Sequence, residues 1–72
     1  MEVRLFATLR DGRGKVVDIE WREGMDGRGL FAELGIPEED VALFIVNGAH
    51  SKPENKLAQC DVIALFPPVG GG

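Results

Sequence analysis

Two short segments of the chain, residues 41–46 and 61–66, constrain the fold most strongly because they are apolar on both faces. Every residue from Val41 to Val46 is apolar, and in the second segment only Asp61 is polar. Apolar runs of roughly four to eight residues are typical of strands with both faces buried. A chain of 72 residues has room for one small domain. Both segments are therefore predicted to be interior strands of a single sheet.

The N-terminal third of the chain has the alternation of strands that bury one face. The apolar positions of the first segment are Val3, Leu5, Ala7 and Leu9, and those of the second are Val17, Ile19 and Trp21. This period of two is expected of a strand that packs one side on a core. Residues 10–14 contain Asp and two Gly, which are typical turn residues. The two segments are predicted to form a hairpin.

The spacing of apolar residues becomes helical after residue 25. The apolar stripe is formed by Leu30, Phe31 and Leu34. Asp26 is the predicted N-cap of this helix, and Gly35 is its predicted C-cap. Gly27 and Gly29 weaken the first turn by up to ~1 kcal/mol each relative to Ala. We therefore expect one short helix that frays at its start.

The second half of the chain continues with strand, loop and strand. Asn47 and Gly48 favour a tight type I′ turn directly after the first apolar segment. Residues 49–59 are polar and irregular, with Leu57 as their predicted core anchor. This order predicts an α+β β-grasp, or ubiquitin-like, roll: a mixed sheet of about four to five strands packs on one short helix, with the first and last strands as parallel neighbours. The β-grasp domain is expected to span residues 1–66, followed by a flexible tail at 67–72.

Charge and rare residues exclude several classes of partner and site. Twelve acidic residues against eight scattered basic ones give a formal charge of −4, so nucleic-acid binding is not expected. The run at 41–46 is about a third of the ~20 residues that a membrane-spanning helix needs, so no membrane insertion is expected. Cys60 and His50 are single residues of their kinds, too few for a structural zinc site or a disulfide. Without a basic and apolar leader, the single thiol predicts a cytoplasmic protein.

No group of residues has the pattern of an enzyme active site. Residues 27–32 match the loose dinucleotide pattern GxGxxA, but the chain is too short for the fold that uses it. Cys60 and His50 would form a nucleophile and base only across a polar loop; Cys60 is better interpreted as a turn or core residue than as a redox thiol. His50 and the acidic run 38–40 are interpreted as solvated surface, with a contact to a basic partner as the alternative for the run. We predict that the chain is not an enzyme, holds no metal and binds no cofactor.

The last six residues, 67–72, combine a stiff exit from the sheet with a glycine arm. Pro67 and Pro68 stop the last strand because they lack backbone donors, and three of the ten glycines end the chain. Extended, six residues reach up to ~20 Å, and glycines pass through a narrow channel. This pattern predicts chemistry performed on the carboxylate of Gly72 inside another protein; the simpler interpretation is a frayed terminus.

Three segments of the sequence resemble the MoaD/ThiS family of ubiquitin-like sulfur carriers. They are residues 5–10 (LFATLR), 46–48 (VNG) and 64–72 (ALFPPVGGG). The resemblance covers the whole chain, and its FPP-V-GG ending is the most specific part. Within the family, the pattern is most similar to the small, sulfur-carrying subunits of molybdopterin synthase.

The resemblance implies a function. An E1-like enzyme would use ATP to adenylate Gly72, and the acyl-adenylate would accept sulfur as a thiocarboxylate. The large subunit of molybdopterin synthase would then take the sulfur for molybdenum or tungsten cofactor assembly. In this interpretation Val69, Gly70 and Gly71 pass through the partner's channel, while Pro67 and Pro68 aim the arm. The alternatives are a carrier for thiamine, with thiazole synthase as partner, or for another sulfur metabolite, and a ubiquitin-like protein modifier.

Strand phase predicts a second functional surface. If Val3 and Leu5 face the helix, Phe6 faces outward, and if Leu65 faces inward, Phe66 also faces outward on the neighbouring strand. Two phenylalanines on an open sheet face form an apolar patch of the kind that marks an interface. In the family, the matching phenylalanines lie where the partner docks. The alternative is that one of them closes a minor core.

Overall fold

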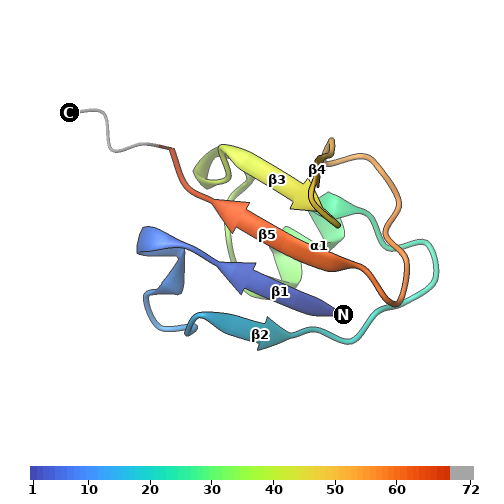
Figure 1. Cartoon of the computed structure of the whole chain (residues 1–72), viewed down its shortest axis with the longest axis horizontal. Coiled ribbons are helices and arrows are strands. Elements are labelled where there is room, and N and C mark those ends of the chain that lie inside the picture. Colours follow the sequence, from blue (N-terminus) through green and yellow to red (C-terminus); the bar gives the residue numbers. More distant parts are fainter. Residues whose placement is uncertain (69–72) are drawn as a thin grey trace.

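The computed structural model describes residues 1–68 as a five-stranded sheet packed on one α-helix (Figure 1). The strands are β1 (Glu2–Leu5), β2 (Val16–Asp18), β3 (Leu43–Val46), β4 (Ala49–His50) and β5 (Val62–Phe66), and the helix is α1 (Gly27–Leu34). Their order across the sheet is β2-β1-β5-β3-β4. This arrangement is the predicted β-grasp roll, with five strands.

The two segments that are apolar on both faces occupy interior positions of the sheet, as predicted. β5 is the central strand, parallel to β1 and antiparallel to β3. Its Ile63 and Leu65 face the helix and are fully buried, while alternate residues lie half-buried on the other side. Leu5 is paired with Leu65. Parallel pairing brings the carboxyl ends of β1 and β5 to the same edge of the sheet (Figure 1).

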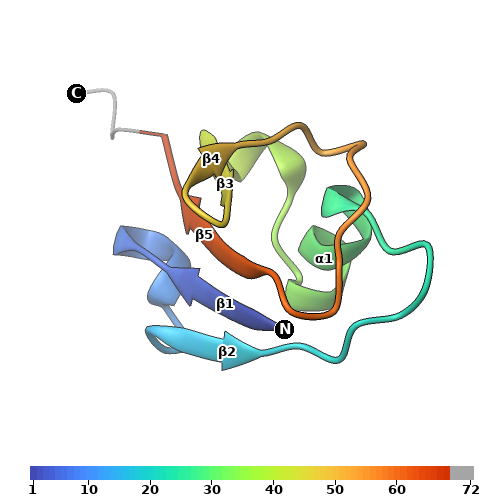
Figure 2. The ribbon, with the colours of Figure 1, turned by 45° about the vertical axis from the view of Figure 1, so that its right-hand side comes forward.

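Helix α1 has the caps that the sequence predicts. The Asp26 side chain accepts a hydrogen bond of 2.9 Å from the backbone N–H of Gly29, and Gly35 ends the helix in the left-handed conformation with φ 70°. Leu30 and Phe31 are buried against the sheet. The helix covers one face of the sheet and leaves the other face open (Figure 2).

The first strand is shorter than its alternation predicts. β1 ends at Leu5, and Ala7, with φ 53°, begins the 3₁₀-helix η1 (Ala7–Arg10). The prediction that Ala7 points into the core is wrong, since Ala7 is exposed. Leu9 is buried, as predicted, but the turn of η1 rather than a strand carries it inward. Period-two alternation does not distinguish these cases, because Leu9 is apolar and buried in either conformation.

The second strand also ends early, at Asp18 instead of Trp21. Its partner β1 begins near Met1, and the last hydrogen bonds of this pair join Met1 and Ile19. The pairing between these two strands extends no further within residues 1–68. The Trp21 side chain instead donates a hydrogen bond of 2.8 Å from Nε1 to the carbonyl of Leu57.

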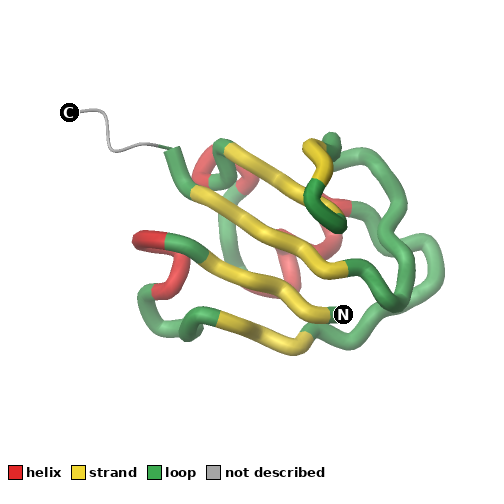
Figure 3. The backbone as a smooth tube through the Cα atoms, in the orientation of Figure 1, coloured by secondary structure: helices red, strands yellow, loops and turns green. Residues whose placement is uncertain are grey.

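The loop between β3 and β5 is partly ordered, contrary to the expectation of an irregular stretch (Figure 3). Asn47 (φ 51°) and Gly48 (φ 84°) form the predicted tight turn, and the two residues after it form β4 at the edge of the sheet. Leu57 is buried, as predicted. The acidic run is a short exposed 3₁₀-helix, η2 (Glu38–Asp40).

Candidate functional site

The side chains of Phe6 and Phe66 stack on the open face of the sheet. Their ring centroids are 4.2 Å apart and the planes differ by 9°. Phe6 follows the last residue of β1, and Phe66 is the last residue of β5. Both rings are half-buried, whereas Leu5 and Leu65 before them are buried under the helix. The predicted outward, side-by-side placement of the two rings is confirmed.

Apolar side chains of β3 and β5 extend this stack into a larger surface. Leu43 is paired with Phe66, and Ile45 with Ala64, so these side chains lie on the same open face. Leu43 keeps 40% of its surface exposed. We call this surface the open-face patch; it consists of Phe6, Leu43, Ile45, Ala64 and Phe66. Leu43 and Ile45 are assigned to the patch by the register between β3 and β5, which cannot be read from the sequence alone.

Arg10 lies at the edge of the open-face patch. Its guanidinium carbon is 5.4 Å from the centre of the Phe6 ring, and its Nε donates a hydrogen bond of 2.8 Å to the carbonyl of Leu5. The contact is a cation–π interaction. The sequence-based prediction missed Arg10; the signal available was its position four residues after Phe6.

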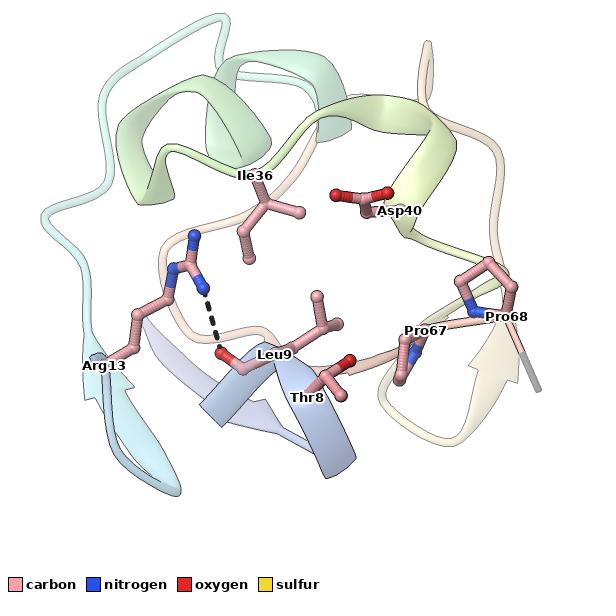
Figure 4. Close-up of a pocket in the computed structure, with 7 residues that line it drawn as sticks. All are labelled: Thr8, Leu9, Arg13, Ile36, Asp40, Pro67 and Pro68. Atoms are coloured by element: carbon pink, nitrogen blue, oxygen red, sulfur yellow. Dashed lines mark hydrogen bonds between the residues drawn. The ribbon is translucent and has the colours of Figure 1, made fainter. Parts of the chain in front are cut away.

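A pocket of about 370 Å³ lies at the base of the tail (Figure 4). It is lined by Thr8, Leu9, Arg13, Ile36, Asp40, Pro67 and Pro68. The Arg13 guanidinium donates to the carbonyls of Leu9, Leu34 and Gly35 at 3.0 to 3.2 Å. It thereby joins η1 to the C-terminal end of α1, where a cation is favourable.

The tail leaves the sheet between this pocket and the open-face patch. Pro67 and Pro68 line the pocket and directly follow Phe66 of the stack. The predicted tail residues Val69, Gly70, Gly71 and Gly72 lie outside the described residues. The described part of the chain thus places an apolar face, a cation and two prolines around the start of the tail.

The model of the ThiS family matches residues 3–72. The chain belongs to the ThiS family. A solved structure described as a putative molybdopterin converting factor, subunit 1, from Pyrococcus furiosus is 29% identical and superposes with a TM-score of 0.76; the match covers 94% of this chain and 95% of that one. Members of the MoaD/ThiS family are small sulfur carriers, so this ThiS-family protein is a sulfur carrier.

The remaining candidate residues of this ThiS-family protein lie on its surface. Cys60 is exposed in the turn before β5, and His50 is exposed on the edge strand β4. Within residues 1–68, no three His, Cys, Asp or Glu side chains are grouped as metal ligands. The same part of the chain contains no helix that is long and apolar enough to cross a membrane.

Several charged groups of this ThiS-family protein form ion pairs on the surface. A hydrogen bond of 2.8 Å joins Arg28 to Glu38, and this bond together with the charge of Glu38 raises the pKa of the Arg28 guanidinium above its ordinary value. Arg22 is paired with Glu33 on the helix side. Exposed pairs of this kind contribute little to stability. A raised pKa keeps the arginine protonated, so it does not mark a catalytic acid or base.

Proposed function

We propose that this ThiS-family protein carries sulfur as a thiocarboxylate on Gly72 and donates it in molybdopterin biosynthesis. The observation that carries the proposal is the similarity to a molybdopterin converting factor subunit over nearly the full length of both chains. Further support comes from the family match, which includes residues 69–72.

The chemistry of a carboxylate explains why such a carrier needs an activating enzyme. A carboxylate resists nucleophilic attack because its charge is delocalised and oxide is a poor leaving group. Transfer of AMP from ATP to an oxygen of Gly72 releases pyrophosphate and creates a mixed anhydride. A sulfur nucleophile then attacks the carbonyl carbon and displaces AMP, leaving a C–S bond. We assign this catalysis and the ATP to an E1-like partner enzyme.

The geometry around Pro67 suits delivery of a terminal group into another protein. Pro67 and Pro68 restrict the backbone φ at the exit from β5, so the direction of the tail is set at its base. The six residues from Pro67 to Gly72 reach up to ~20 Å when extended. This length would bring the carboxylate into a partner's active site while the domain stays outside.

The open-face patch is the surface that we assign to partner docking. Aromatic side chains in an exposed apolar patch are typical centres of binding energy in protein interfaces. The Phe6–Phe66 stack lies at the base of the tail, so a protein that covers it also receives the tail. For molybdopterin biosynthesis, that protein would be the large synthase subunit, since the similar solved chain is described as subunit 1 of a converting factor.

Mass spectrometry of the intact chain tests the proposed chemistry. We expect incubation with the cognate E1-like enzyme, ATP and a sulfur donor to add about 16 Da, because a thiocarboxylate replaces one oxygen by one sulfur. A chain without Gly72 should fold normally and gain no mass. An unchanged mass of the full chain with its cognate enzyme would contradict the proposal, as would unfolding of the shortened chain, which would give the tail a structural role.

Binding measurements test the proposed docking surface. Phe6→Asp and Phe66→Asp should abolish binding of the large synthase subunit, because each places a charge inside the interface. Ala32→Asp is the matched control, because Ala32 is exposed on α1, on the opposite side of the sheet from the patch. Normal binding by both Phe variants would show that the partner docks elsewhere.

Thiamine biosynthesis is a second candidate for the acceptor pathway, favoured by the ThiS family match itself. The chemistry at Gly72 would be the same, and thiazole synthase would replace the large synthase subunit as partner. Supplying the thiocarboxylated chain to each enzyme in turn distinguishes the pathways: the cognate enzyme returns the chain to its original mass as sulfur leaves.

A further inference from the structure

Arg10 is held rigidly at the edge of the open-face patch. Its backbone carbonyl accepts hydrogen bonds of 2.9 Å from the N–H groups of Arg13 and Gly14, and its Nε donates to the carbonyl of Leu5. The guanidinium also lies over the Phe6 ring. The side chain is half-buried. The hydrogen bond to Leu5 and the contact with the Phe6 ring thus fix the position of the guanidinium before any partner binds.

The terminal nitrogens of Arg10 have no hydrogen-bond partner within residues 1–68. Each of the other four arginines either pairs with a carboxylate or bonds its terminal nitrogens to carbonyls; these residues are Arg4, Arg13, Arg22 and Arg28. Arg28 is the informative comparison, because it lies on α1, which covers the opposite face of the sheet, and its charge is already paired with Glu38. Arg10 therefore presents two unused donor groups beside an apolar surface.

Covering the patch would remove water from these donors. An unpaired cation in a dry interface is strongly unfavourable, because the cation loses its hydration without gaining a partner. A partner that fits this surface must therefore supply an acceptor. A carboxylate matches a guanidinium best, because two parallel N–H groups bind its two oxygens. The chain carries a net charge of −4, so attraction by overall charge would select a basic partner. Arg10 demands an acidic group at one defined point.

We propose that Arg10 is a specificity-determining residue that binds an aspartate or glutamate side chain of the large synthase subunit. The carboxylate would lie at the edge of an apolar surface that covers Phe6 and Phe66. This inference rests on the proposed function, because it requires the open-face patch to be the docking surface for that subunit.

Titration calorimetry of the full chain with the large subunit tests the role of Arg10. Arg10→Gln should weaken binding by about 30-fold or more, the lower range for breaking a desolvated charge pair. Arg28→Gln, which also removes one positive charge, should change the dissociation constant by no more than about twofold. Binding of the unmodified chain should weaken between roughly 50 and 500 mM NaCl, and Arg10→Gln should show a smaller salt dependence.

Arg10→Lys separates the paired charge from a purely structural role. Lysine keeps the charge but lacks the planar fork and the Nε donor, so binding should weaken by roughly fivefold while the salt dependence is retained. This variant also keeps the test valid if Arg10→Gln loses stability, which Trp21 fluorescence during urea denaturation would reveal.

The outcomes distinguish this inference from the function on which it rests. Suppose that Arg10→Gln binds the large subunit with a dissociation constant within about twofold of that of the unmodified chain, while Phe66→Asp does not bind. The proposed role of Arg10 is then wrong, and the proposed docking surface is supported. Weakening by Arg28→Gln as large as that by Arg10→Gln would also overturn the inference, since any positive charge would then serve. If Phe66→Asp binds normally, the docking surface and the inference both fail.

Discussion

Gly27 and Gly29 lie in the same turn of α1, yet the structure predicts opposite effects of replacing them by alanine. A Cβ atom at Gly27 would lie 2.6 Å from Cε2 of Phe44 and 2.9 Å from the Cα and O atoms of Pro53. A Cβ atom at Gly29 would lie 3.4 Å from Oδ1 of Asp26, an acceptable contact. Gly27 is therefore required by packing, and Gly29 is not.

The cost of Gly27→Ala follows from how little its neighbours can move. The Phe44 ring is 5% exposed and packs edge-on against Phe31, with centroids 5.2 Å apart. The Pro53 atoms belong to the backbone, and the Pro53 carbonyl also accepts a hydrogen bond of 3.1 Å from the N–H of Arg28. Overpacking costs ~1–3 kcal/mol, and alanine recovers up to ~1 kcal/mol of helix propensity. We expect a net loss of about 1–2 kcal/mol in the free energy of unfolding.

Urea denaturation followed by Trp21 fluorescence measures this loss, because Trp21 packs on the core and is bonded to the same loop. In a thermal melt followed by the same fluorescence, Gly27→Ala should lower the melting temperature by about 4–16 °C in a domain of this size. Gly29→Ala should leave stability unchanged or raise it by up to ~1 kcal/mol. Equal stabilities of the two variants would refute the packing argument.

Three further substitutions test other parts of the fold by the same denaturation experiment. Asp26→Ala should cost about 1 kcal/mol, because it removes the N-cap hydrogen bond; no loss would mean that the cap is not formed. Asn47→Ala should cost roughly 2–3 kcal/mol, since it removes bonds to Asp61 and Val62 and places alanine at φ 51°; Asn47→Gly should recover part of this, and equal losses would exclude the backbone contribution. Leu65→Ala should cost about 2–5 kcal/mol, because Leu65 is fully buried; a smaller loss would contradict its central place in the core.

Most of the fold could be predicted because its signals are local. Asp26 and Gly35 act through their own backbone and the adjacent turn, so their roles as helix caps follow from residue type and position. The Asn47–Gly48 turn is equally local. The stack of Phe6 on Phe66 required one further step, the parallel pairing of the first and last strands, which the two-sided apolar pattern of residues 61–66 favours.

The sequence-based predictions were wrong about the ends of β1 and β2 and about β4, because strand length depends on the neighbouring strand as well as on residue type. β2 ends at Asp18 although the apolar alternation continues to Trp21, and β1 ends where Ala7 turns the chain into η1. The short strand β4 forms because the tight turn after β3 returns the chain beside it. None of these limits is encoded in the alternation of the strands themselves.

The α+β class, the helix caps, the central position of residues 61–66 and the resemblance to sulfur carriers could all be predicted from the amino-acid sequence. These properties depend on composition, periodicity and short motifs. Three other properties are visible only in the tertiary structure. They are the lack of space for a side chain at Gly27, the residues of β3 that join the open-face patch, and the unpaired terminal nitrogens of Arg10 within residues 1–68. Each of these depends on contacts between residues far apart in the chain, because packing and ion pairing depend on distances in space.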